Sequence, residues 1–467
     1  MRTSRDPTST AALTFLGAVD TVTGSRFLVE TRGVRVLVDA GLYQGLTVHR
    51  SRNWDPFPVD PAGIDHVVLT HAHLDHTGYL PRLVKDGFAG RVTCTAETAD
   101  LAAIVLRDSA HLQQEDARYA NVAGFSRHHP ALPLYDDGDV EQALKLIEPV
   151  DLDRPLRLGP DITLTLRSAG HILGSATAAL RLGQHRVAFS GDLGRAHHPL
   201  LRPPAVPPES DTLVVESTYG DRQHPPPDPQ LLADAVSRTV ARGGSVLIPA
   251  FAVDRTELVL LELRRLMERG DIPDVPIFVD SPMALAALDC YRRAASRGGP
   301  QLRTEARELL ADLDGPHVHA VDDVEGSMRL NNPRTPSIVI SASGMASGGR
   351  VVHHLAHQLP DRRNCVVLTG YQAEGTRGRQ LADGARQVKI HGHYVPVRAE
   401  VVTLSDFSVH ADAGETVDWL SRTPVPPHTV YVVHGEPRSA TALARRVSEE
   451  LGWTAVVPRY GERVLVD

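Results

Sequence analysis

Four side chains that can bind a metal ion lie within six residues in the first fifth of the chain. The segment runs from His71 to His76, reads His-Ala-His-Leu-Asp-His, and directly follows the apolar run from Val67 to Thr70. Such a run predicts a buried strand, so the four side chains share one loop at a strand end. Neutral imidazole with carboxylate is a donor set that suits zinc. The segment therefore predicts a divalent metal site.

Three further candidate ligands occur later in the chain, each next to a short apolar strand. His171 lies between predicted strands at 161–166 and 177–182, whereas Asp192 and His434 each follow a strand. A single His or Asp at a strand end is usually an ordinary loop residue. These three residues become candidate metal ligands only in combination with the cluster at 71–76.

The size and charge of the chain limit what it can be. Its 467 residues exceed one ordinary core, which predicts two domains. The formal net charge of −8 means that the chain as a whole is not basic, as many nucleic-acid binders are. Bound divalent cations and a local groove of arginines can still make the electrostatic potential at one site positive. Lysine occurs only at Lys85, Lys145 and Lys389, so phosphate contacts would fall mainly to arginine.

Sequence features also bear on the cellular compartment. No apolar run approaches the length of a membrane span, and the first ten residues lack the apolar core of a secretory signal. Cys94, Cys290 and Cys365 are far apart and are interpreted as small buried side chains in a reducing environment. We therefore expect a cytoplasmic protein with no membrane partner. A homo-oligomer is compatible with the sequence.

The order of predicted elements divides the chain. Residues 12–38 alternate in short apolar runs that predict an antiparallel meander, and residues 99–119 predict a long helix. After a proline-rich breaker at 224–229, strands and helices alternate, which predicts an α/β domain with a parallel sheet. From about Val401 the pattern of predicted elements changes again, and His410 and His434 each lie in a short predicted loop.

The combined motifs resemble the β-CASP branch of the metallo-β-lactamase superfamily. The first cluster is similar to the superfamily signature, and segments at 216–220, 407–412 and 433–436 resemble motifs A, B and C of the branch. Val409 stands where relatives more often have Ala. The resemblance implies an αββα metallo-β-lactamase sandwich from residues 1–219 and 402–467, an inserted α/β β-CASP domain at 220–401, and an active site in the cleft between the domains.

The resemblance also implies two Zn²⁺ ions per chain, which Mn²⁺ or another divalent ion could replace. One ion would be bound by His71, His73 and His171, the other by Asp75, His76 and His434, with Asp192 bridging the two together with a hydroxide. Asp39 would orient a ligand histidine from behind. His410, oriented by Glu216, would protonate the leaving 3′ oxygen.

A glycine-rich segment from Ser341 to Arg350 is the candidate substrate loop. Glycines allow close backbone approach, a helix start offers N–H groups, and an arginine offers a fork for phosphate. The predicted contacts are Ser343, Gly344, Gly348, Gly349 and Arg350. The remaining histidine pairs are interpreted as surface or groove residues, namely 128/129, 197/198, 353/354 and 391/393.

These inferences together predict a zinc-dependent ribonuclease that hydrolyses RNA phosphodiester bonds in RNA processing or decay. His434 favours RNA, because DNA-acting members of the branch carry Val at motif C. The alternatives are an ester or lactone hydrolase, a DNA nuclease and a non-catalytic RNA-binding scaffold. The inserted domain with Glu216 and His410 argues against the first, and the full ligand set argues against the last. Endonuclease and exonuclease action both stay open.

Overall fold

The computed structural model describes residues 11–31, 33–124, 128–311, 313 and 315–466. The first ten residues, which we expect to contain no secretory signal, lie outside this part. The chain divides into two compact units. The first includes Met1–Gln44, Val48–Gln223 and His410–Asp467, and the second includes Gly45–Thr47 and His224–Val409.

Two seven-stranded sheets form within the described residues of the first unit. The first sheet contains, in spatial order, β22 (Arg463–Val466), β1 (Ala11–Phe15), β2 (Phe27–Thr31), β3 (Val34–Val38), β4 (His66–Val68), β5 (Arg91–Cys94) and β6 (Ile147–Pro149). The second contains β21 (Ala455–Val456), β20 (Thr429–Val433), β11 (Thr212–Glu216), β10 (His185–Phe189), β9 (Ala176–Leu182), β8 (Ile162–Ser168) and β7 (Leu156–Gly159). Strands β1 to β3 are the predicted antiparallel meander, and β3 to β6 continue in parallel.

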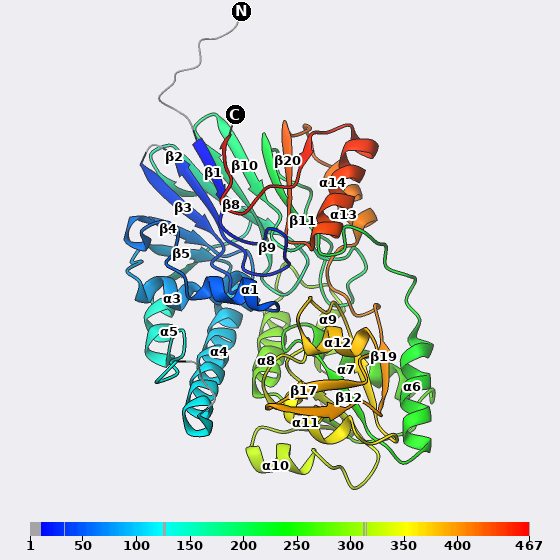
Figure 1. The fold of residues 1–467 in the computed structure, drawn as a ribbon. Coiled ribbons are helices and arrows are strands. Elements are labelled where there is room, and N and C mark those ends of the chain that lie inside the picture. Colours follow the sequence, from blue (N-terminus) through cyan, green and yellow to red (C-terminus); the bar gives the residue numbers. More distant parts are fainter. Residues whose placement is uncertain (1–10, 32, 125–127, 312, 314, 467) are drawn as a thin grey trace, which may run out of the picture. The chain divides into compact units, whose positions relative to one another are not determined.

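The two sheets pack face to face, and helices cover their outer faces. Phe15 and Val38 of the first sheet share one core with Leu164 and Phe189 of the second. The outer face of the first sheet packs against α3 (Leu80–Lys85), α4 (Ala96–Ala123) and α5 (Asp137–Leu144), and that of the second packs against α13 (Ala413–Ser421) and α14 (Pro437–Leu451). This four-layer order confirms the predicted αββα sandwich (Figure 1). Shorter pieces are α1 (Thr47–Arg50), α2 (Leu74–Thr77), η1 (Ser51–Asn53) and η2 (Pro61–Gly63).

The second unit is an α/β domain, as predicted. Its main sheet contains β14 (Val318–Ala320), β13 (Ile277–Val279), β15 (Ile338–Ser341), β12 (Val246–Pro249), β16 (Cys365–Leu368) and β19 (Glu400–Thr403), and all its strand pairs are parallel. Its helices are α6 (Pro229–Ala241), α7 (Arg255–Glu268), α8 (Pro282–Ser296), α9 (Ala306–Ala311), α10 (Val324–Arg329), α11 (Arg350–Gln358) and α12 (Arg377–Ala382). A separate hairpin pairs β17 (Gln387–Ile390) with β18 (His393–Pro396).

Two expectations about side chains and membranes can be compared with these elements. Cys94, Cys290 and Cys365 are buried and form no disulfide bond, as interpreted from their spacing. Among the described helices, none combines the length and the apolar character needed to cross a membrane.

Candidate metal centre

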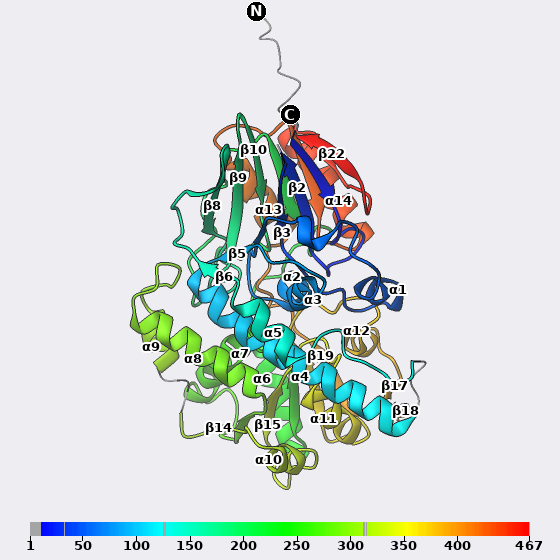
Figure 2. The same ribbon diagram turned by 90° about the vertical axis from the view of Figure 1, so that its left-hand side faces the viewer.

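The candidate ligands gather where strands of both sheets end. The cluster at 71–76 follows β4, which lies parallel to β3, and Asp39 follows β3. In the second sheet Asp192 and His434 follow β10 and β20, which flank β11 in parallel. Parallel strands end at the same edge of a sheet, so this topology brings together residues that are far apart in sequence. Figure 2 shows β8, β9 and β10 side by side in the second sheet.

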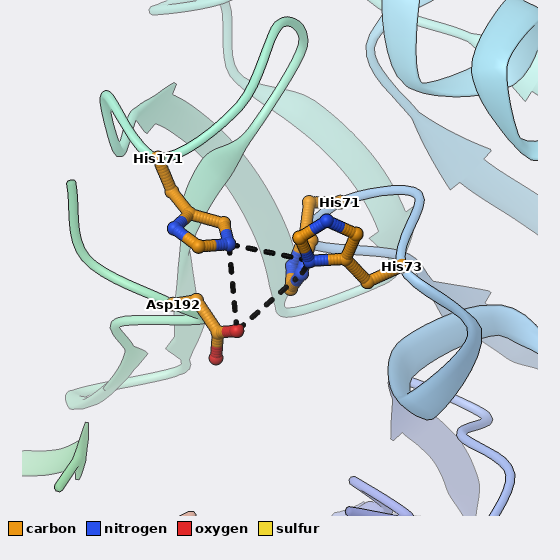
Figure 3. Close-up of side chains that lie close together, drawn as sticks. All are labelled: His71, His73, His171 and Asp192. Carbon is orange, nitrogen blue, oxygen red and sulfur yellow. Dashed lines mark hydrogen bonds and ion pairs between the residues drawn. The ribbon is translucent and has the colours of Figure 1, made fainter. Parts of the chain in front are cut away.

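The first ligand group contains His71, His73, His171 and Asp192. His73 Nδ1 lies 3.1 Å from His71 Nε2 and 3.3 Å from His171 Nε2. Asp192 Oδ2 lies 3.5 Å from His71 Nε2 and 3.6 Å from His171 Nε2. Figure 3 shows His171 and Asp192 pointing from their loops toward the two histidines of the signature segment.

The second ligand group contains Asp75, His76 and His434. His434 Nε2 lies 3.2 Å from His76 Nε2 and 3.4 Å from Asp75 Oδ2. The other carboxylate oxygen of Asp192, Oδ1, lies 3.3 Å from His76 Nε2. One oxygen of Asp192 therefore faces each group, as a bridging carboxylate requires.

These spacings fit a pair of tetrahedral metal sites. Ligand atoms about 2.0–2.1 Å from a central ion are about 3.3 Å apart along the edges of a tetrahedron. The seven distances between donor atoms given above range from 3.1 to 3.6 Å, and all donor atoms within each group lie within 4.8 Å of one another. Moreover, Asp192 Oδ1 is buried and accepts no hydrogen bond within the described residues. The donor set, its spacing and this buried oxygen suit zinc-like ions.

The electrostatics of the cluster also suit cations. Burial holds the pKa of His71 well below its ordinary value and lowers the pKa of His73 to about 4, so both imidazoles stay neutral and able to bind metal. Burial would lower the pKa of His76 as well, but Asp192 and Asp39 outweigh it and raise that pKa well above its usual value. A positive charge at this position is therefore favoured by the two buried carboxylates. A metal ion bound at Nε2 would supply that charge and displace the proton from Nε2, while the Nδ1–H stays on Asp39.

Several neighbours fix the ligand side chains. His76 Nδ1 donates to Asp39 Oδ2 at 2.7 Å, which turns Nε2 toward the second group, and Thr70 donates to the same carboxylate through its N–H and hydroxyl. Thr218 Oγ1 lies 3.2 Å from His434 Nδ1. Such outer contacts are typical of metal-bound imidazoles. Sequence reasoning overlooked Thr70 and Thr218, although each lies within or beside a recognised motif.

Two loops around the cluster are held by close backbone packing. Gly191 has a φ of 58°, and a Cβ atom there would lie 2.8 Å from Thr70 Cβ, so a glycine is required just before Asp192. The loop that carries His171 is fixed at Gly174, whose carbonyl accepts hydrogen bonds from the hydroxyls of Thr95 and Thr98 at 2.7 and 2.9 Å. Thr95 is also the N-cap of α4. The long helix thereby anchors one ligand loop.

His410 and Glu216 lie beside the ligand groups. His410 Nδ1 lies 3.1 Å from Glu216 Oε1 and 3.9 Å from Asp192 Oδ2. Glu216 is 2 % exposed and also accepts hydrogen bonds from the backbone N–H groups of Leu193 and Thr218. The carboxylate is therefore rigid, and it orients the imidazole next to the centre.

The glycine-rich segment has a different environment. Arg350 donates to Asp280 Oδ1 and to two backbone carbonyl groups, so its guanidinium group is already hydrogen-bonded within the second unit. Gly344 packs so closely that a Cβ atom would lie 2.5 Å from the ring of Phe251. His354 is fully buried and lies 2.5 Å from Asp280 Oδ2, and His198 is 3% exposed, so the interpretation of both as surface or groove residues is wrong. Residues on one face of a helix recur every three or four positions, so one of two adjacent histidines can be buried and the other exposed, which the sequence pair alone does not reveal.

Comparison with known proteins agrees with this architecture. Residues 20–240 match the metallo-beta-lactamase superfamily, residues 256–381 the Beta-Casp domain, and residues 394–458 the Zn-dependent metallo-hydrolase RNA specificity domain. The chain is 37% identical to "Ribonuclease TTHA0252" of Thermus thermophilus, over 96% of this chain and 99% of the relative. The chain belongs to the β-CASP family of metallo-β-lactamase-fold hydrolases.

Other β-CASP relatives carry different names. The chain is 33% identical to "Transcription termination factor FttA" of Pyrococcus abyssi, over 96% of this chain and 70% of the relative. It is 30% identical to an "RNase J-like protein" of Methanocaldococcus jannaschii, over 96% and 98%. A solved structure of a protein of unknown function from Enterococcus faecalis covers 98% of this chain and is itself covered in full, with a TM-score of 0.52 and 14% identity. That likeness supports the fold alone.

Proposed function

We propose that this chain hydrolyses RNA phosphodiester bonds at the metal centre, as a ribonuclease of RNA processing or decay in the cytoplasm. The observation that carries the proposal is the pair of ligand groups, with Asp192 in the first and 3.3 Å from His76 of the second, and with the Glu216–His410 pair beside them. A relative named as a ribonuclease, similar along almost the whole chain, supports it.

The ligands would hold two zinc ions. His71, His73 and His171 would hold one, Asp75, His76 and His434 the other, and Asp192 both. Such ions supply Lewis acidity and a nucleophilic hydroxide at neutral pH, and they stabilise the charge that develops on the phosphoryl oxygens. Asp39 keeps the His76 ring in the ligand orientation by accepting its Nδ1–H.

The Glu216–His410 pair would supply the proton for the leaving group. Glu216 accepts the Nδ1–H of His410, so we assign the transferred proton to Nε2, the ring nitrogen on the far side from Glu216. That proton would pass to the 3′ oxygen as its bond to phosphorus breaks. The products would be a 5′-phosphate and a 3′-hydroxyl.

The glycine-rich segment would contact RNA at Ser343, Gly344, Gly348, Gly349 and Arg350. Gly349 is the N-cap residue of α11, and Gly348 has open space around its Cα, so the backbone there can approach a phosphate. Arg350 already pairs with Asp280. Its main contribution would therefore be to hold the shape of the loop and to add positive charge.

The test is cleavage of matched RNA and DNA by protein purified without chelator. We expect about two zinc-like ions per chain by metal analysis and faster cleavage of end-labelled single-stranded RNA than of DNA with the same sequence. Equal cleavage of both polymers would indicate a general nuclease. Brisk ester hydrolysis without cleavage of either polymer would contradict the proposal.

A further inference from the structure

The hairpin of β17 and β18 presents a polar and aromatic outer face. Val388 and Ile390 are 1% and 2% exposed and pack into the core of the second unit, where Val395 also packs. Because side chains alternate along a strand, Lys389 lies on the opposite face. It pairs in register with Tyr394, whose side chain is 66% exposed. An exposed ring therefore stands directly across from a lysine.

This segment is basic in an acidic chain. From Arg386 to Arg398 the sequence contains three cations and no carboxylate, whereas the whole chain has a net charge of −8. Arg386, Lys389 and Arg398 are all exposed. In the described part of the chain, none of the three forms an ion pair. Arg238, which is also exposed in the same unit, is in contrast paired with Glu400.

Two contacts join the hairpin to the glycine-rich segment. Arg377 donates to the carbonyl of Lys389 at 2.9 Å and to the carbonyls of Ala346 and Ser347 at 2.8 and 3.1 Å. His353, in the helix that begins at the end of that segment, has its ring centroid 4.6 Å from that of His391 at the hairpin turn. The surface is therefore continuous from Ser347 to the hairpin.

We infer that Lys389, His391, Tyr394 and His353, here called the hairpin face, bind a single-stranded segment of the RNA. Unpaired bases would stack on the exposed rings, and Lys389 would contact the backbone phosphates. Exposed aromatic rings beside cations are the usual means of holding single strands, and duplex bases do not offer their faces. The inference rests on the proposed function, since it takes RNA as the substrate.

The test compares Tyr394→Ala with Tyr394→Phe on a single-stranded RNA substrate. Loss of the ring should raise KM roughly tenfold, the usual scale for one stacked base, with kcat changed less than about twofold. Tyr394→Phe keeps the ring and should stay near wild type. Tyr119→Ala is the matched control, because Tyr119 is 53% exposed on α4 of the first unit.

A second variant tests the phosphate contact. Lys389→Ala should reduce the slope of log Kd against log salt concentration by about 0.7, the change expected for one lost phosphate contact on a single strand. If wild-type protein neither binds nor cuts RNA, the proposed function itself fails. If wild type cuts RNA while Tyr394→Ala keeps the wild-type KM, only the inferred binding of RNA to the hairpin face is contradicted. A changed oligomeric state with unchanged KM would make this face a protein interface instead.

Discussion

Two buried aspartates, one in each unit, follow parallel strands and have histidine neighbours, yet their surroundings differ. Asp280 is fully buried and receives short hydrogen bonds from His354, Ser327 and Arg350, at 2.5, 2.6 and 2.7 Å. Asp192 is 2% exposed, but its imidazole neighbours stay 3.3–3.9 Å away. The first carboxylate has its own cation within the chain. The second has neighbours spaced as ligands around an ion.

A third buried carboxyl group shows another solution. Glu257 in α7 is fully buried, and neither oxygen has a hydrogen-bond partner within the described residues. Burial and the nearby Asp254 raise its pKa well above the ordinary value, which favours the protonated form. A buried carboxyl can thus be matched by an internal cation, by a proton or, as proposed for Asp192, by metal. The distances to its neighbours distinguish the three cases.

The largest expected effect comes from removing the shared carboxylate. Asp192→Ala should leave fewer than one metal ion per chain and lower kcat on RNA by roughly 10⁴-fold or more, because each ion contributes several kcal/mol of charge stabilisation. Metal analysis and cleavage assays on the same preparation measure both effects. An Asp192→Ala protein that keeps two ions would show that the carboxylate does not bridge.

Removing His410 should separate proton transfer from metal binding. His410→Ala should keep two metal ions but lose roughly 10²–10⁴ in kcat on RNA, the usual contribution of a positioned proton donor. The loss should shrink on an activated nitrophenyl phosphodiester, whose leaving group needs no proton. A lost metal ion, or equal loss on both substrates, would make His410 a ligand or a structural residue.

The sequence located the clustered side chains of the candidate site better than their surroundings, for a physical reason. The ligands follow apolar strands, and strand ends can be located from local patterning, so all seven predicted ligands fall in one cluster. The pairing of Arg350 with Asp280 joins residues 70 positions apart on α11 and after β13, and no local signal marks it. The burial of His354 likewise depends on which face of α11 meets the sheet. Tertiary contacts of this kind are absent from local patterns.

Breaking the internal ion pair should affect stability without affecting the metal centre. Burial would raise the pKa of Asp280, but hydrogen bonds from His354, Ser327 and Arg350 outweigh it and hold that pKa below its usual value. Asp280→Ala leaves the buried imidazole of His354 and the guanidinium of Arg350 without their carboxylate partner, which should lower the free energy of unfolding by about 3 kcal/mol. Denaturant unfolding measures this, with metal content expected to stay at two. The exposed pair Glu325–Arg329 supplies the control, and Glu325→Ala should change stability by less than about 0.5 kcal/mol.

The smallest effect should come from Glu257→Gln, and it should depend on pH. Because the folded-state pKa is raised, the stability that Glu257 contributes is fully present below its unfolded pKa, about 4.3, and is lost as pH rises toward the folded value. Glutamine cannot ionise. Relative to the variant, the free energy of unfolding of wild type should fall by about 1.4 kcal/mol for each pH unit between the unfolded and the folded pKa of Glu257. Comparing the two proteins at each pH cancels the titration of the metal centre, which they share.

Urea unfolding at about pH 5 and pH 6 measures this difference. Glu268→Gln in the same helix is the matched control, because Glu268 is exposed and pairs with Arg264 at 2.6 Å. The control should show no such dependence on pH. A Glu257→Gln protein whose stability relative to wild type is the same at both pH values would mean that Glu257 is ionised in the folded protein. The chain would then hold a cation against this carboxylate, as it does for Asp280. Glu257 would no longer be an example of a buried carboxyl group matched by a proton.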